Sequence, residues 1–282
     1  MSNGGKADFF TGGNGENGAS EWRKWMLSVD AVFSCKLQID RDSVRLVPRM
    51  GASKTDSLAP MNPENDIPIL PEPFPPAPEA AIRTFAPDVV AKLENYGKQL
   101  ATEGVIRGLI GPREVPRLWD RHLLNCAALA ELIKPGERVA DIGTGAGLPG
   151  LVLALVRTDI QIILVEPLQR RCDFLQEMIL RFRFGSRVTV RRGKSNVIKP
   201  CEADVVTSRA VAALDKLAGW SLPHAKIGGR LLAMKGDRAA EELAAAGAAL
   251  KPFGADVGAT VLTCGQGWLE TPVQVVCAVR TR

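Results

Sequence analysis

One stretch decides the fold of this chain, and it reads Asp141-Ile142-Gly143-Thr144-Gly145-Ala146-Gly147-Leu148-Pro149-Gly150. It follows a short apolar run that predicts a strand, and the segment after it, 151–156, is compatible with a helix. Glycine lacks a Cβ and tolerates a positive φ, so glycines at every second position let a ligand approach the backbone closely. Pro149 suits the first turn of a helix, where its missing N–H costs no hydrogen bond. The stretch therefore predicts a strand–loop–helix unit that binds a nucleotide-type cofactor, with Gly143 and Gly145 at the binding site.

Two cofactors compete for this loop. Gly145-x-Gly147-x-x-Gly150 matches the dinucleotide fingerprint, and Glu166 follows about 20 residues later, where a ribose-binding acid is expected. In that fingerprint, however, the first glycine comes directly after the strand and the pyrophosphate binds the helix N-terminus. Here Asp141 and Gly143 come first, which gives Asp-x-Gly-x-Gly-x-Gly, the pattern typical of S-adenosylmethionine (SAM) methyltransferases. SAM has a sulfonium and an amino group, which a nearby carboxylate attracts. We therefore favour SAM, with NAD as the alternative.

The composition bounds the class of protein. The 282 residues are 46% hydrophobic and 24% charged, which predicts one domain of about 200 residues plus an extension. No apolar run reaches the roughly 18 residues of a membrane span, and no signal peptide opens the chain, so we expect a cytoplasmic protein without a membrane partner. The six cysteines form no C-x-x-C pair and only two histidines occur, so we expect reduced cysteines and no metal. The net charge of +5 favours a polyanionic partner.

The chain divides near residue 78. Residues 1–20 are rich in Gly, Asn and Ser, and eight prolines lie within 60–78, which neither a helix nor a strand accommodates. Between them, 21–37 has apolar residues at helical spacing, compatible with a short amphipathic helix. We predict that 1–77 is a mostly disordered, proline-rich extension and that 78–282 is the catalytic domain.

From residue 79 the hydrophobic pattern becomes regular. Helical spacing occurs over 89–100, 118–133, 168–182 and 238–250, with breaks at proline and glycine. The predicted strands are 138–142, 161–165, 188–192, 203–207, 230–234, about 260–264 and 273–279. Alternating strands and helices predict an α/β fold with a doubly wound, Rossmann-like, mostly parallel sheet. The last two strands have no helix between them and predict a C-terminal antiparallel hairpin, which is usual in SAM methyltransferases and absent from typical NAD domains.

The carboxyl ends of parallel strands form the expected ligand site. The second strand ends at Glu166, whose carboxylate can accept both ribose hydroxyls. The third strand is followed by Ser195 and Asn196, which can read the adenine edge. The fourth and fifth strands are followed by Arg209 and Lys235, which should border the same pocket.

Several segments resemble the RsmG (GidB) family, the 16S rRNA guanine-N7 methyltransferases, over the chain from about residue 100 to the end. The matching segments are Leu118-Trp-Asp-Arg-His-Leu-Leu-Asn-Cys126, Asp141–Gly150, Val165-Glu-Pro-Leu-Gln-Arg-Arg-Cys-Asp-Phe-Leu175, Thr207-Ser-Arg-Ala-Val-Ala212 and Met234-Lys-Gly236. The Arg-His pair and the Ser-Arg-Ala segment are more specific than the glycine loop. The resemblance implies methyl transfer from SAM to N7 of a guanine in 16S rRNA. We expect a cytoplasmic monomer whose partner is 16S rRNA or the small ribosomal subunit, and no DNA.

The resemblance also implies SAM contacts at Gly143, Leu148, Ser195, Asn196 and Arg209. The family usually has Gly-Arg-Ala-Glu where this chain has Gly193-Lys-Ser-Asn196. The change keeps a backbone contact at Ser195 and puts a carboxylate role at Asn196 in doubt.

Guanine N7 carries a lone pair and no proton, so the reaction needs positioning rather than a general base. Candidate phosphate contacts are Arg113, Arg117, Arg121, Arg181, Arg183, Arg187, Arg191, Arg192, Lys194 and Lys199, of which we expect half to touch RNA. His122 lies on an apolar helix stripe, which is typical of a core histidine, whereas its neighbour Arg121 can face the pocket. The main rival from another class is a non-catalytic SAM- or nucleotide-binding RNA module.

Overall fold

The computed structural model describes residues 37–40, 43–46 and 74–282, and the chain divides into two units, residues 1–67 and 68–282. In the first unit, β1 (Leu37–Asp40) pairs with β2 (Ser43–Leu46) in antiparallel fashion, where the sequence pattern had predicted no strand. The helix predicted over 21–37 lies outside the described residues, except for Leu37, which opens β1. The disorder predicted for 1–77 stays a prediction.

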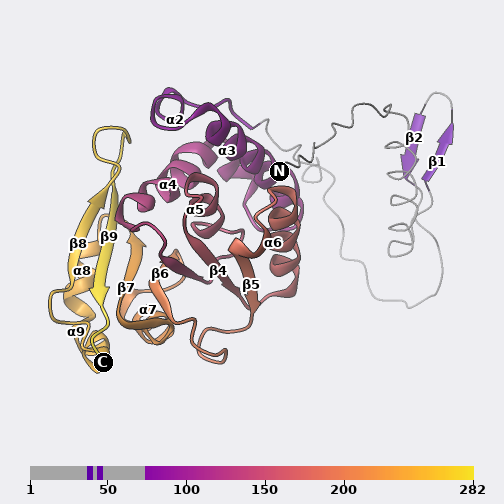
Figure 1. The fold of residues 1–282 in the computed structure, drawn as a ribbon. Helices are drawn as coiled ribbons and strands as arrows, with labels where there is room; N and C mark the ends of the chain where they lie inside the picture. The colour runs from indigo at the N-terminus through magenta and orange to yellow at the C-terminus, as the bar shows by residue number, and fades with distance from the viewer. Residues whose placement is uncertain (1–36, 41–42, 47–73) are drawn as a thin grey trace, which may run out of the picture. The chain divides into compact units, whose positions relative to one another are not determined.

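A seven-stranded sheet forms the centre of the second unit (Figure 1). Its strands are β3 (Arg138–Ile142), β4 (Gln161–Glu166), β5 (Val188–Arg192), β6 (Ala203–Arg209), β7 (Ala225–Lys235), β8 (Thr260–Cys264) and β9 (Val273–Val279). They lie in the order β5-β4-β3-β6-β7-β9-β8. The first five are parallel, and β9 runs antiparallel to both β7 and β8. The predicted doubly wound sheet with a C-terminal antiparallel hairpin is confirmed, and every predicted strand is present, although β7 begins earlier than predicted.

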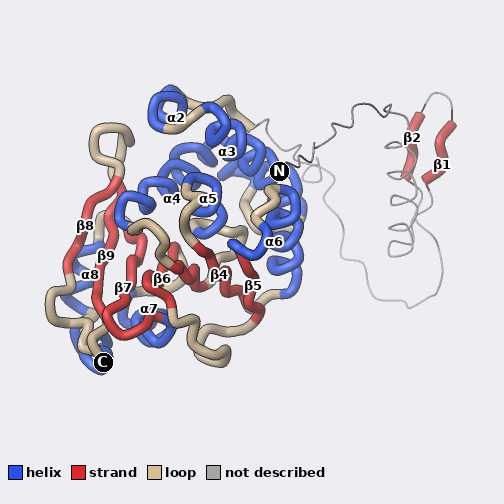
Figure 2. Tube along the Cα trace, viewed as in Figure 1, coloured by secondary structure: helices blue, strands red, loops and turns tan. Residues whose placement is uncertain are grey.

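Helices cover both faces of the sheet (Figure 2). The α-helices of this unit are α2 (Glu79–Thr84), α3 (Pro87–Gln99), α4 (Asn125–Ala128), α5 (Gly150–Val156), α6 (Gln169–Arg181), α7 (Leu214–Ser221), α8 (Ala239–Ala245) and α9 (Gly247–Leu250). The shorter 3₁₀ and π turns are η1 (Leu100–Gly104), η2 (Pro112–Arg117), η3 (Leu118–Leu124), η4 (Leu129–Leu132), η5 (Gly185–Arg187), η6 (Leu222–His224) and η7 (Lys251–Phe253). Among the described residues, no helix is long and apolar enough to cross a bilayer. The predicted helix over 118–133 is a run of η3, α4 and η4, whereas α2 and α7 were not predicted.

Alternation along the strands separates two hydrophobic cores. Val139 and Ile162 face the core under α3, α4, α5 and α6, whereas Ala140 and Ile163 face the core under α7, α8 and α9. Successive side chains of a strand point to opposite faces, so an apolar run buried on both sides produces this three-layer arrangement.

The unit begins before the predicted boundary at residue 78. The ring of Phe74 lies 5.6 Å from that of Trp119, and a Cβ on Gly97 would overlap the Phe74 ring. Trp119 Nε1 donates a hydrogen bond to the carbonyl of Pro75 at 3.0 Å. Residues 74–77 therefore pack on the helical layer.

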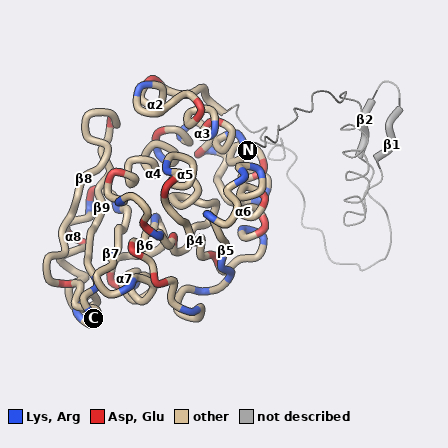
Figure 3. Tube along the Cα trace, in the orientation of Figure 1, with Lys and Arg blue, Asp and Glu red and all other residues tan. Residues whose placement is uncertain are grey.

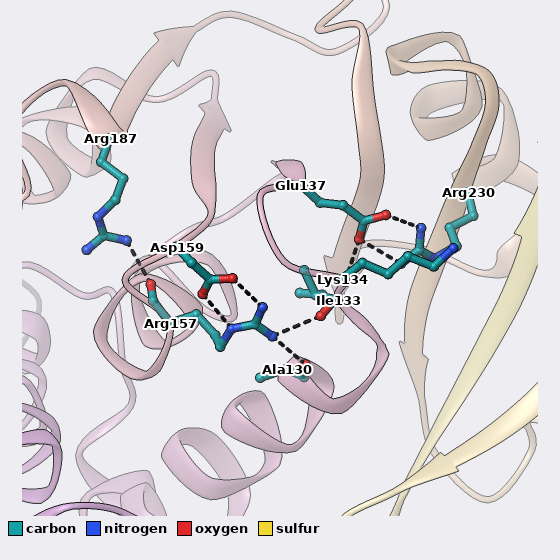
Figure 4. A network of polar contacts seen from close by, with 8 residues as sticks. All are labelled: Ala130, Ile133, Lys134, Glu137, Arg157, Asp159, Arg187 and Arg230. Carbon is teal, nitrogen blue, oxygen red and sulfur yellow. Dashed lines mark hydrogen bonds and ion pairs between the residues drawn. The ribbon is translucent and has the colours of Figure 1, made fainter.

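The amino ends of the strands are held by a network of paired charges (Figure 4). Arg230 donates to both carboxylate oxygens of Glu137 at 2.7 and 2.8 Å, and Arg157 donates to both oxygens of Asp159 at 2.7 Å. Arg187 donates to the carbonyls of Ala154 and Arg157 at 2.9 Å each. Arg187 had been predicted to hold RNA phosphates. The structure instead gives it the free carbonyls at the end of α5, on the edge of the sheet opposite the glycine loop.

Candidate cofactor and substrate site

The predicted ligand site lies at the carboxyl ends of the central strands. β3 pairs with β4 on one side and β6 on the other, all parallel, so the order of strands reverses at β3. This is the switch point where open α/β sheets bind ligands. Opposite pairs such as Glu166 with Arg192 and Arg209 with Met234 bring the loops after these strands to one edge.

Asp141 fixes the glycine loop to both elements that flank it. Its side chain is fully buried, and its Oδ2 accepts hydrogen bonds from Thr144 Oγ1 at 2.6 Å and from the Gly150 N–H at 2.8 Å. Burial raises the pKa of Asp141 to about 6, and the hydrogen bonds from Thr144 and Gly150 offset only part of that shift. The other oxygen, Oδ1, has no hydrogen-bond partner among the described residues.

A second anchor reaches the loop from the helical layer. Tyr96 of α3, the chain's single tyrosine, is buried, and its hydroxyl donates to the Ala146 carbonyl at 2.6 Å. A Cβ on Gly147 would lie 2.9 Å from that hydroxyl. A helix that precedes the sheet in the chain, α3, therefore anchors the glycine loop through Tyr96.

The glycines of the loop are required for different reasons, which the space around each one shows. Gly143 has a φ of 67°, and a Cβ there would lie 2.8 Å from Val211 Cγ2. Gly150 packs against Leu164 and Asp141, where a Cβ would overlap both. Gly145 has a φ of 59°, and the nearest atom to a Cβ there is Arg171 Nη1 at 3.9 Å. Gly143 is required by packing as well as by its backbone angle, whereas Gly145 has open space in front of it.

The carboxylate of Glu166 binds protein donors on both oxygens. Oε2 accepts the Gly145 N–H at 3.0 Å and lies 3.6 Å from Arg171 Nη1, and Oε1 accepts the Leu168 N–H at 3.1 Å. Its side chain is only 1% exposed. A carboxylate has about four lone-pair positions, so capacity for a ribose hydroxyl remains, but the first duty of Glu166 is to hold Gly145.

A first cavity of about 400 Å³ opens beside the loop. It is lined by Ile142, Gly143, Val165, Pro167, Gly193, Lys194, Ser195, Asn196, Val211 and Trp220. Val211, from the loop between β6 and α7, and Trp220 of α7 form an apolar wall, and the polar turn after β5 forms another. An apolar pocket with a few polar groups suits a planar heteroaromatic base attached to a sugar.

His224 supports the polar wall. It is buried, and its Nε2 lies 2.8 Å from the Ser195 carbonyl oxygen. A carbonyl only accepts, so Nε2 carries the proton and donates. Burial lowers the pKa of His224, which favours the neutral ring. The conformation of the turn at 193–198 thus depends on a histidine of η6, distant in sequence.

A second cavity of about 630 Å³ adjoins the first, with Val211 in the walls of both. Its lining comprises Arg121, His122, Asn125, Arg209, Ala210, Val211, Ala212, Ala213, Met234, Lys235, Gly236, Glu242 and Val273. Ala210 has a φ of 54°, a left-handed conformation that costs a non-glycine residue roughly 1–2 kcal/mol. Backbone strain of this kind concentrates at functional sites, and here it brings Val211 back over Gly143.

The cations of the second cavity differ in their partners. Lys235 Nζ is 2.7 Å from Glu242 Oε2, which lowers the pKa of Glu242, and Arg121 Nη1 is 3.3 Å from Glu114 Oε1. Arg209 lies within ion-pair distance of no described carboxylate. The charge of Lys235 is therefore compensated by Glu242, whereas that of Arg209 is compensated by no described carboxylate.

The family model described as "rRNA small subunit methyltransferase G", GidB, matches residues 89–264. The chain belongs to this family. A ribosomal RNA small subunit methyltransferase G from Rhodococcus jostii is 54% identical over 66% of this chain and 83% of its own length. The protein of the same name from Mycolicibacterium smegmatis is 51% identical over 73% of this chain and 88% of its own. Among solved structures, the SAM-dependent methyltransferase SibL in its apo form has a TM-score of 0.48 at 16% identity, covering 72% of this chain and 77% of that chain.

Membership of the GidB family confirms the resemblance predicted from the sequence. The seven residues that the sequence analysis had assigned to SAM, from the motif and from the resemblance together, fall into three groups. Gly143, Ser195 and Asn196 line the first cavity, and Arg209 lines the second. The other three sit in neither lining: Gly145 and Glu166 bind each other, and Leu148 is 5% exposed in the core under α3 to α6. Any contact of Leu148 with a ligand is thereby confined to its backbone.

Among the residues at the first cavity that were not predicted, three shape its walls directly or from behind. Val211 directly follows the Ser-Arg-Ala segment, so its position in the chain was a usable signal. Trp220 lies on α7, whose buried positions Leu214, Leu217, Ala218 and Ser221 have helical spacing. His224 gave no local signal, because its partner Ser195 lies 29 residues away in the chain.

Proposed function

We propose that this chain transfers the methyl group of SAM to N7 of a guanine in the 16S rRNA of the small ribosomal subunit. One observation carries the proposal: a cavity suited to an adenosine lies at the glycine loop, and Val211 lines both it and a larger cavity that contains an arginine without a carboxylate partner among the described residues. A donor and an acceptor placed on the two sides of Val211 would meet at the carboxyl edge of β3 and β6.

The residues present fit SAM. Trp220 and Val211 offer apolar contact to the adenine, the turn at Ser195 offers backbone groups to its edge, and Gly143 keeps the loop open. Asp141 Oδ1 is a buried acceptor without a partner among the described residues, and a nearby cation would stabilise its ionised form. When bound, SAM supplies a methyl group made electrophilic by the sulfonium.

The second cavity suits an acceptor that has no proton to lose. His122 has both ring nitrogens engaged, one with Glu114 and one with Arg209, and Glu242 is bound to Lys235. None of the described side chains that line the cavity is therefore a free general base. Guanine N7 attacks through a lone pair, so catalysis by this chain consists of orienting the acceptor and excluding water.

Exposed basic residues give the site an approach for RNA. They occur on the turns before the site and along the chain from α6 to β6 (Figure 3), where those at the end of α6 lie at the amino edge and those after β5 lie beside the site. The exposed members of the predicted set are Arg113, Arg117, Arg121, Arg181, Arg183, Arg191, Arg192, Lys194 and Lys199. Contacts from these side chains to phosphates would supply affinity, while the second cavity takes the splayed-out target base.

The test is methyl transfer from labelled SAM to purified 16S rRNA and to assembled small subunits, followed by mapping of the modified nucleotide. We expect one guanine to be labelled, and we expect no transfer to RNA that carries 7-deazaguanine at that position, since the nucleophilic nitrogen is then absent. Transfer to the 7-deaza RNA would exclude N7 as the acceptor. Calorimetric titration with SAM, and with NAD as control, tests the cofactor separately.

We further propose that residues 1–77 are an extension separate from the catalytic domain, and that the enzyme acts as a cytoplasmic monomer. No described residue before Phe74 lines either cavity. Because Phe74 packs on Gly97, the informative deletion removes 1–67, which we expect to keep SAM affinity within a few-fold. Loss of transfer to RNA with intact SAM binding would assign the extension to substrate recruitment, and light scattering checks the oligomeric state.

A further inference from the structure

Three side chains from separate elements form a chain of hydrogen bonds beside the second cavity. Glu114 of η2 binds His122 of η3 at 2.9 Å between Oε2 and Nε2, and His122 Nδ1 is 2.8 Å from Nη2 of Arg209 at the end of β6. Arg209 Nη1 also donates to the carbonyl of Arg121 at 2.9 Å. The guanidinium is thereby held at two of its nitrogens by η3.

The donor and acceptor roles along this chain follow from Arg209. A guanidinium has five N–H donors and no acceptor, so His122 Nδ1 must accept and cannot carry a proton. The proton of the neutral ring is then on Nε2, which donates to Glu114. Glu114 therefore selects the tautomer of His122 that can receive Arg209, as a carboxylate does for an imidazole in other sites.

We propose that His122, oriented by Glu114, is a positioning residue that fixes the Arg209 guanidinium in the wall of the second cavity and leaves its remaining N–H groups for an oxygen of the bound ligands. The inference rests on the proposed function, because that function supplies the ligands. The oxygen belongs either to the carboxylate of the SAM methionine end or to the incoming nucleotide, and the two sources share the same charge-assisted recognition by arginine.

The surroundings of His122 favour this role over that of a titrating base. The charged groups that face it are Glu114 from η2, Arg121 from its own turn and Arg209 from β6. Burial and the charge of Arg209 lower the pKa of His122, and Glu114 counteracts them only in part. A protonated ring would lose the Arg209 hydrogen bond and place two cations side by side, so the neutral ring is the state that holds Arg209.

The two nitrogens of His122 can be replaced separately, which gives a matched pair of variants. Asn places an amide oxygen at the position of Nδ1 and keeps an acceptor for Arg209, whereas Gln reaches the position of Nε2 and keeps only the contact with Glu114. We expect H122Q and H122A to lose at least tenfold in the step that needs Arg209, and H122N to recover most of that loss. SAM titration without RNA and the Michaelis constant for RNA at saturating SAM show which ligand Arg209 binds. Equal losses in H122N and H122A would overturn the proposal.

A spectroscopic measurement tests the tautomer directly in the full-length protein. The chain has only two histidines, so the H224Q variant leaves His122 as the single imidazole, with assigned ¹⁵N signals. Near pH 7.5 we expect an unprotonated Nδ1 and a protonated Nε2, and a mixture of tautomers after E114A. A protonated Nδ1 in the H224Q protein would overturn the proposal, whereas a wild-type protein that methylates no RNA but shows the expected tautomer would refute the proposed function alone.

Discussion

At the two edges of the sheet, the pKa of an aspartate is shifted in opposite directions. At the amino edge, Asp159 receives both nitrogens of the Arg157 fork, which lowers its pKa to about 2. At the carboxyl edge, Asp141 is buried next to the glycine loop, and burial raises its pKa to about 6. The amino-edge carboxylates Glu137 and Asp159 each have an arginine partner, whereas Asp141 keeps an oxygen without one among the described residues.

This contrast separates structural from functional use of polar groups. At the amino edge, charges are paired with each other and Arg187 binds the free carbonyls at the end of α5, which stabilises the fold. The carboxyl edge contains a strained Ala210, an arginine without a carboxylate and a buried acceptor without a donor. Arg183 and Glu202, near the amino ends of β5 and β6, also have a positive φ, so backbone strain does not distinguish the two edges. The carboxyl edge differs by its buried acceptor without a donor and its arginine without a carboxylate, which a ligand can satisfy.

The largest effect should come from Gly143→Val. A Cβ at Gly143 would lie 2.8 Å from Val211 Cγ2, at a φ of 67°, so the loop cannot keep its shape. We expect SAM affinity to fall by about 100-fold or more, measured by calorimetry on protein shown by circular dichroism to be folded.

Gly185→Val is the matched control for this loop variant. Gly185 also has a positive φ, 59°, but a Cβ there meets nothing within 4 Å, and it lies at the amino edge. We expect a loss of about 1–2 kcal/mol of stability from backbone strain, with SAM binding unchanged. An equal loss of SAM affinity in both variants would mean that the strain, rather than the site, controls binding.

A second effect tests the amino edge alone. Glu137→Ala leaves Arg230, whose side chain is 16% exposed, without its carboxylate. Removing one partner of a largely buried pair costs about 3–5 kcal/mol when burial is complete, so we expect about 3 kcal/mol here, measured by denaturant unfolding. SAM affinity should stay within twofold, and a large change in affinity would contradict the separation of the two edges.

The sequence predicted the strands, the position of the glycine loop and the family, because these depend on local periodicity and on contiguous motifs. It did not predict which cations are free. Arg209 and Lys235 look alike in the sequence, since each follows a strand, yet Lys235 is neutralised by Glu242 of α8 and Arg209 binds η3. Arg187 was misjudged for the same reason. The partner of a charged side chain is set by tertiary packing, and spacing along the chain does not identify it. Glu242 lies only 7 residues from Lys235, whereas the groups that Arg209 contacts lie 88 and 87 residues away.

Asp141→Asn should separate stability from binding. The pKa of Asp141 in the folded chain, about 6, exceeds its ordinary value of 3.8, so folding favours the protonated form. Its stability contribution is therefore complete below pH 4 and is lost as the pH rises to about 6, a loss on the order of 3 kcal/mol.

The asparagine variant should lack this loss and unfold at a higher temperature than the wild type at pH 7. It should bind SAM about tenfold more weakly, and only the wild-type affinity should rise between pH 5 and 7. Thermal scans and calorimetry at pH 5, 6 and 7 check both expectations. A destabilised asparagine variant at pH 7 would show that the ionised carboxylate supports the fold.

The smallest effect distinguishes an exposed basic residue, Lys199, from a partly buried one, Arg187. Lys199→Ala should lower the salt dependence of RNA binding by up to about one unit per lost phosphate contact. Arg187→Ala should leave that slope unchanged and cost about 1 kcal/mol of stability, because its hydrogen bonds go to carbonyls. Filter binding at several salt concentrations gives the salt slope of both variants, and denaturant unfolding gives the stability loss of Arg187→Ala. A reduced slope for Arg187→Ala would return that residue to the RNA surface.

The hydrogen bond from Tyr96 to Ala146 gives the glycine loop and α3 a common opening equilibrium. An amide of α3 exchanges with solvent only when the helix opens, and such an opening must release the loop to which Tyr96 is bound. A ligand that binds only the closed loop lowers the population of the open form by mass action. Methyl-donor binding should therefore slow hydrogen exchange in α3, a helix that contacts the glycine loop but lines neither cavity.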